Sequence, residues 1–111
     1  MSIPEDTFKE LEAKHGEIVE IETKAGPCAF RPCKRDEYDR YQSLIFEKKT
    51  QSKAAEVLVR ATVVYPSKED FTRMLDRYPF IVSTCFTAVA ELSGLNMEPE
   101  VKKSEIASAK I

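Results

Sequence analysis

The sequence of 111 residues contains few of the residues from which recognisable sites are built, with one histidine, three cysteines and three glycines. With so few glycines it has no Gly-rich phosphate-binding loop, and it contains no H-E-x-x-H zinc motif. It also lacks the G-x-S-x-G turn that carries a nucleophilic serine. We therefore expect a protein that is not an enzyme, with no catalytic residues, no cofactor and no metal.

An excess of charge of one sign and a long apolar run are missing as well. Seventeen lysines and arginines against nineteen aspartates and glutamates leave a net charge of −2. Proteins that bind the phosphate backbone of nucleic acids are usually strongly basic. The longest largely apolar run, from Phe80 to Ala90, is far shorter than the roughly 20 residues that cross a bilayer. The first residues lack the parts of a secretory signal. We expect a cytoplasmic protein that binds neither nucleic acid nor membrane.

The three cysteines cannot all pair within one chain, unlike those of a secreted disulfide-rich domain. Cys28, Cys33 and Cys85 fit best as small apolar core residues. With His15 they could in principle supply four zinc ligands, but their spacing contains no compact C-x2-C pair. A redox role is the remaining alternative.

Helical and extended patterns alternate along the chain, with prolines between them. A short helical pattern ends at Gly16, and two extended runs, 17–23 and 28–31, flank a turn that contains Gly26. A lone hairpin is marginal in water, so it must pack on helices or on strands of another subunit, a first indication of an oligomer. Four more helices are predicted, at about 36–49, 52–64, 67–77 and 79–93.

These patterns predict an α+β fold, in which a short N-terminal helix and a β-hairpin are followed by a bundle of about four helices. We assign residues 1–94 to this single domain. Residues 95–111 mix lysine, glutamate, serine and alanine with scattered apolar residues. They are predicted to form a mobile C-terminal tail, which could order on binding a partner.

Aromatic residues near the predicted helix boundaries are the most informative positions. Tyr65 precedes a proline, and Tyr78 and Phe80 flank another. Such residues either pack the corners of the bundle or stay exposed as anchors for an apolar segment of a partner. The sequence does not separate these alternatives. The candidate partner contacts, all aromatic, are Tyr41, Phe46, Tyr65, Phe71, Tyr78 and Phe80.

Five short motifs follow one another along residues 28–94. They are Phe30-Arg31-Pro32 at the end of a strand, DEYDRY at 36–41, LVRATVVYPS at 58–67, MLDRYP at 74–79 and AVAELSG at 88–94. In this order they resemble the small tail assembly chaperones of long-tailed bacteriophages. The resemblance covers most of the chain.

The resemblance implies a non-enzymatic binding protein of the host cytoplasm. Such chaperones coat the helical, apolar tape measure protein, keep it soluble and recruit the tail tube protein, which polymerises around it. A groove between amphipathic helices is the usual receptor for an apolar helical stripe, and an oligomer would add avidity. The alternative hypothesis is a small phage-encoded inhibitor or adaptor that binds one host protein.

Overall fold

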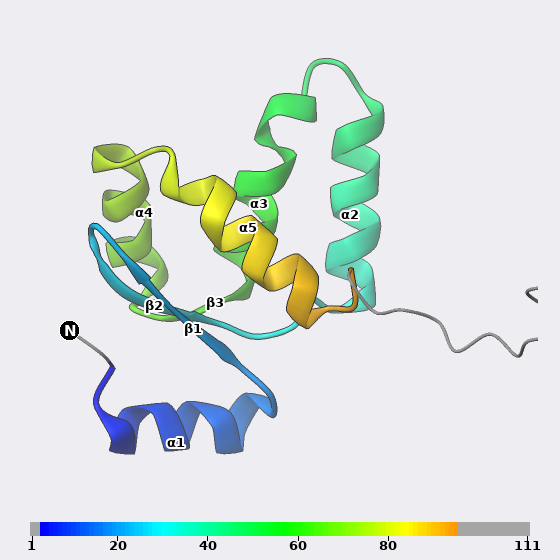
Figure 1. The fold of residues 1–111 in the computed structure, drawn as a ribbon. Coiled ribbons are helices and arrows are strands. Elements are labelled where there is room, and N and C mark those ends of the chain that lie inside the picture. Colours follow the sequence, from blue (N-terminus) through cyan, green and yellow to red (C-terminus); the bar gives the residue numbers. More distant parts are fainter. Residues whose placement is uncertain (1–2, 96–111) are drawn as a thin grey trace, which may run out of the picture.

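The computed structural model describes residues 3–95, which contain six helical segments and three strands. In chain order these are α1 (Glu5–His15), β1 (Val19–Thr23), β2 (Gly26–Phe30), α2 (Arg35–Phe46), the 3₁₀ turn η1 (Gln51–Lys53), α3 (Ala54–Thr62), β3 (Val63–Tyr65), α4 (Lys68–Arg77) and α5 (Ile81–Leu92). Helix α1 lies on one side of the sheet and the remaining helices on the other (Figure 1). The predicted α+β fold is confirmed.

The sheet is antiparallel, with the strand order β1-β2-β3. At the hairpin turn the Thr23 hydroxyl donates to the carbonyl of Gly26 (2.7 Å) and accepts from the N–H of Ala25 (3.1 Å). Gly26 has a φ of 124°, a backbone conformation that residues with a Cβ rarely adopt. The local sequence therefore specifies this turn.

Strand β3 takes the place of the last turn of the helix predicted over 52–64. Helix α3 ends at Thr62, and Val63–Tyr65 pairs with β2. These three residues are β-branched or aromatic, the types that favour strands. The hairpin is thus extended by a strand of the same chain and does not by itself require a strand from another subunit.

The alternation of side chains along β2 separates two hydrophobic clusters. Cys28 and Phe30 belong to the larger cluster, on the side of α3, α4 and α5, where the rings of Phe30 and Phe71 pack in a T-shaped pair with centroids 5.6 Å apart. Ala29, between them, belongs to the smaller cluster with Ile3 and Ile18, against which α1 packs. Successive residues of a strand point to opposite faces, so β2 contributes to both.

Two of the three cysteines are core residues, as predicted. Cys28 and Cys85 are completely buried, Cys33 is half-buried, and all three are free thiols. A hydrogen bond to Cys28, together with burial, raises the pKa of Cys85. Within residues 3–95 no group of three or more His, Cys, Asp or Glu side chains is placed to hold a metal ion.

The ends of the helices agree with several of the local patterns. Ser67 caps α4 by accepting a hydrogen bond from the N–H of Asp70 (3.2 Å), and α1 ends before Gly16, as predicted. Helix α5 begins at Ile81, two residues after the predicted start at Pro79. None of the helices in residues 3–95 is long and apolar enough to cross a membrane. Apart from Leu95, the predicted tail lies outside the described residues.

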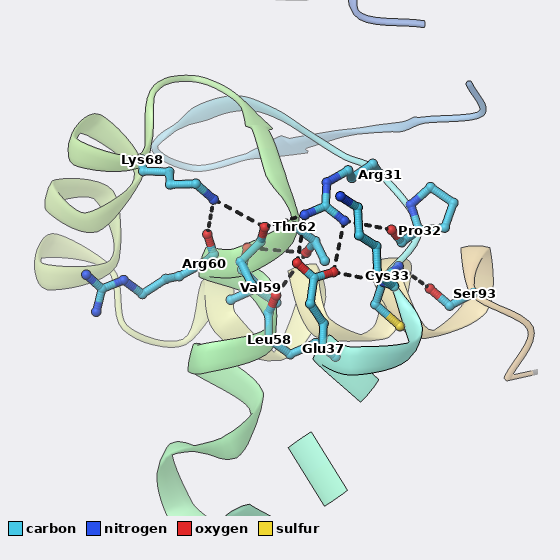
Figure 2. A network of polar contacts seen from close by, with 12 residues as sticks. Arg31, Pro32, Cys33, Glu37, Leu58, Val59, Arg60, Thr62, Lys68 and Ser93 are labelled. Atoms are coloured by element: carbon cyan, nitrogen blue, oxygen red, sulfur yellow. Dashed lines mark hydrogen bonds and ion pairs between the residues drawn. The ribbon is translucent and has the colours of Figure 1, made fainter. Parts of the chain in front are cut away.

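One arginine holds together three segments of the chain (Figure 2). The Arg31 guanidinium, at the end of β2, donates to both carboxylate oxygens of Glu37 on α2, at 2.9 and 2.8 Å. It also donates to the carbonyl of Ala61 at the end of α3 (2.9 Å), and the Arg31 N–H donates to the carbonyl of Thr62 (3.1 Å). Arg31 and Glu37 are largely buried, with side chains 16% and 18% exposed.

Glu37 also caps the helix on which it lies. It accepts a hydrogen bond from the N–H of Lys34, the residue before α2, at 2.8 Å. This is the backward contact that a glutamate makes in the first turn of a helix. The hydrogen bonds from Arg31 lower the pKa of Glu37 below its ordinary value, with the Lys34 N–H adding to the shift and burial opposing it. Glu37 is therefore held as a carboxylate.

We expect Glu37→Gln to lower the free energy of unfolding at pH 7 by about 1–3 kcal/mol, because hydrogen bonds to charged groups contribute about that much. The pKa of Glu37 is lower in the folded state than its ordinary value of about 4.5. The carboxylate therefore contributes fully to the free energy of unfolding at any pH above that ordinary value. This contribution is lost as the pH falls through the lowered pKa. Urea denaturation at several pH values measures the difference between wild type and variant, which should shrink in acid.

The matched control is Glu56→Gln, which breaks an exposed ion pair with Arg60 on α3 (3.4 Å). Such pairs contribute little, so this change should stay within about 0.5 kcal/mol. Equal losses in the two variants, or a Glu37→Gln loss that does not change with pH, would contradict the role given to Arg31 and Glu37.

Candidate functional site

An apolar groove of about 620 Å³ lies where α2, α3 and the end of α5 meet. This volume is in the range of sites that receive a ligand or a partner's side chains. Helix α3 packs against both α2 and α5, so its Leu58 lines the groove between them. The other apolar lining residues come from α2, from α5 and from just beyond α5: Tyr38, Tyr41, Phe86, Ala90 and Leu95.

Two half-buried aromatic rings form part of its wall. Tyr41 of α2 lies against Phe86 of α5, with ring centroids 5.3 Å apart and the planes tilted by 33°. Both side chains pack against the larger hydrophobic cluster. Burial raises the pKa of the Tyr41 hydroxyl, with a smaller contribution from Tyr38. These rings therefore join the groove to the core.

The rim of the groove exposes large apolar side chains to solvent. Tyr38 is 45% exposed and Leu95 is 65% exposed. Tyr38 and Tyr41 are three residues apart on α2, a spacing that places them on one helix face. A partner that covered this rim would remove apolar surface from water, which is the main favourable contribution to most protein association.

The polar groups of the groove bind one another. The Tyr38 hydroxyl accepts a hydrogen bond from the side chain of Gln42 (2.9 Å). The Ser93 hydroxyl accepts one from the N–H of Cys33 (3.0 Å), which ties the segment before α2 to the end of α5 (Figure 2). What these residues leave for a partner is mainly apolar surface, with Lys34 and Arg35 beside it.

The six predicted contact residues do not form one surface. Tyr41 lines the groove, whereas Phe46 at the end of α2 and Phe80 before α5 lie outside it. Phe46 and Phe80 are 90% and 91% exposed. They are therefore separate apolar points that a partner can reach.

The other three predicted residues pack within the chain to different extents. Phe71 is completely buried against Phe30. Its prediction as a partner contact is therefore wrong, because no part of its side chain is exposed to a partner. Tyr65 is half-buried against the smaller cluster. The half-buried Tyr78 ring has the Lys24 ammonium 5.6 Å and the Arg77 guanidinium 5.5 Å from its centroid.

Sequence reasoning missed most of the groove. Leu58 and Phe86 lie inside predicted helices and are not among the predicted contacts, and Leu95 is the first residue of the predicted tail. The three-residue spacing of Tyr38 and Tyr41 is the local pattern that places two of the lining residues on one helix face. The groove itself requires the relative positions of α2, α3 and α5.

The fold and the groove define a small α+β domain with an open apolar surface between helices. Residues 11–102 match the family of a domain of unknown function, DUF6848, and the chain belongs to that family. Its fold is similar to that of an uncharacterised protein, rbstp2171, from Bacillus stearothermophilus, with a TM-score of 0.68 and 20% identity over 86% of this chain and 99% of that chain. This similarity shows the fold alone. No curated protein matches the sequence.

The contrast between Phe71 and Phe80 predicts effects of very different size for the same substitution. We expect Phe71→Ala to lower the free energy of unfolding by about 3–5 kcal/mol, the usual cost of removing a buried phenylalanine. Phe80→Ala should change this free energy by less than about 0.5 kcal/mol, because an exposed ring makes few packing contacts in the folded protein. Urea denaturation measures both, and a large loss for Phe80→Ala would show that Phe80 is buried in solution.

Proposed function

We propose that this protein is a tail assembly chaperone of long-tailed bacteriophages. In this proposal it acts in the host cytoplasm and binds apolar helical stretches of the tape measure protein non-covalently. Covering those stretches keeps the tape measure protein soluble until the tail tube forms around it. The proposal rests on the motif order at residues 28–94 and on one structural observation, the apolar groove between α2 and α5.

The groove has the shape and chemistry that a helix needs in a receptor. Helix α2 has 12 residues and so extends about 18 Å, which corresponds to about three turns of a helix lying beside it. A partner helix with apolar residues at spacings of three and four presents one face to such a groove. The half-buried Tyr41 and Phe86 and the exposed Tyr38 and Leu95 offer apolar surface to that face.

Exposed aromatic residues outside the groove support a protein with more than one partner. Phe46 and Phe80 are almost fully exposed and belong to no part of the groove lining. The tail tube protein or a second copy of this chain are the partners that we propose for them. Several copies along one tape measure chain would bind with avidity while each single contact stayed weak and reversible.

The proposal predicts a gene for a tape measure protein beside this one, and co-expression of the two proteins tests it. We expect the wild-type protein to keep the tape measure protein in the soluble fraction and to co-purify with it. Tyr38→Glu combined with Leu95→Glu should abolish most of this co-purification, because two carboxylates at the rim would oppose burial of the apolar partner. Solubility and co-purification are read from the same lysates.

The control variant carries Gln51→Glu and Ser52→Glu, two exposed positions on η1 that change the charge by the same amount away from the groove. It should co-purify as the wild type does. A tape measure protein that stays insoluble, or a rim variant that binds as well as the control, would overturn the proposal. Capture of one bacterial protein at fixed stoichiometry would instead favour the inhibitor or adaptor hypothesis.

A further inference from the structure

A second cavity, of about 740 Å³, lies near the sheet and is lined by segments from four parts of the chain. Its basic residues come from the end of α1, from the connection between β2 and α2, and from the start of α4. They are Lys14, His15, Arg31, Lys34 and Lys68. No aspartate or glutamate is among its lining residues. This concentration of positive charge is unexpected in a chain whose net charge is −2.

Most of these charges are not neutralised locally. Among residues 3–95, no ion pair joins Lys14, Lys34 or Lys68 to a carboxylate. Lys68 donates instead to the carbonyls of Arg60 (2.7 Å) and Ala61 (3.2 Å) at the end of α3, and the nearby Glu37 carboxylate is already bound to Arg31. Figure 2 shows Lys68 and Arg31 approaching this end of α3.

The charges act on one another across the cavity. Burial is the largest cause that lowers the pKa of His15, and the charges of Lys14, Arg31 and Lys34 lower it further. Burial is also the largest cause that lowers the pKa of Lys68, followed by the charge of Arg31, and the Glu37 carboxylate opposes this shift. Like charges gathered in a concave surface produce a positive potential that attracts anions.

We propose that this cavity binds a short acidic segment of a partner protein, whose carboxylates lie between Lys14, Lys34 and Lys68. The site is a different cavity from the apolar groove, although Lys34 lines both, and it does not depend on the function proposed above. Beside the cations the cavity offers apolar surface from Val64 and Pro66. A segment in which acidic and apolar residues alternate matches both features.

Other anions match the cavity less well. Among the described residues its lining contains no phenylalanine, tyrosine or tryptophan, the large rings on which bases most often stack. The guanidinium of Arg31 is bound to Glu37, and the one aromatic ring left in the described lining is the imidazole of His15. A long nucleic acid would also meet the acidic residues that give the chain its net charge of −2. A peptide needs only the local positive potential and the adjoining apolar surface.

Fluorescence anisotropy with a labelled synthetic peptide, in which glutamate alternates with valine, tests this site. We expect the wild-type protein to bind this peptide, to bind it more weakly as salt is raised, and not to bind the same peptide with glutamine in place of glutamate. Lys14→Gln combined with Lys34→Gln should weaken binding about tenfold, the effect of losing two partly exposed ion pairs. Lys14→Gln alone should weaken binding about threefold, the effect of losing one such ion pair. Because Lys14 does not line the apolar groove, this single variant tests the cavity without changing the groove.

The matched control removes the same charge elsewhere, through Lys48→Gln and Lys49→Gln, both exposed beyond the end of α2. It should change the affinity by less than about twofold. The proposal is overturned if the acidic peptide does not bind, if the glutamine peptide binds equally well, or if the two double variants weaken binding alike. Tighter binding of a single-stranded oligonucleotide of equal charge would also overturn it, in favour of a nucleic-acid ligand.

Discussion

The contact between Arg31 and Glu37 is the interaction on which the arrangement of the chain depends. It joins the end of β2 to the first turn of α2, and Arg31 also reaches the carbonyl of Ala61 at the end of α3. Apolar packing alone has no direction, whereas a two-point contact between a guanidinium and a carboxylate sets an angle as well as a distance. The two surfaces described above both use segments that this contact orients.

These two surfaces differ in chemistry although they share one boundary. Lys34 lines both the apolar groove and the basic cavity, because the connection between β2 and α2 passes between them. The groove suits an apolar helix, whereas the cavity suits carboxylates, so one partner with both features or two partners could be held at once. A small domain can present two surfaces in this way because β2 is buried on both faces and fixes the elements on each side.

Local patterns predicted the elements whose cause is local. The hairpin turn at Gly26, the end of α1 before Gly16 and the cap of α4 by Ser67 all depend on residues close in sequence. Strand β3 was missed because Val63 and Val64 continue the pattern of α3 and also suit a strand. Pairing with Ala29 and Phe30, more than 30 residues earlier in the chain, selects the strand.

The sequence by itself determined the class of fold, the order of most elements and the placement of Cys28 and Cys85 in the core. Only the tertiary structure decided which aromatic residues a partner can reach. Phe71 and Phe80 are both predicted partner contacts, yet Phe71 is completely buried against Phe30 and Phe80 is almost fully exposed. The difference in their burial depends on contacts between segments far apart in the chain, and the periodicity of neighbouring residues does not predict those contacts.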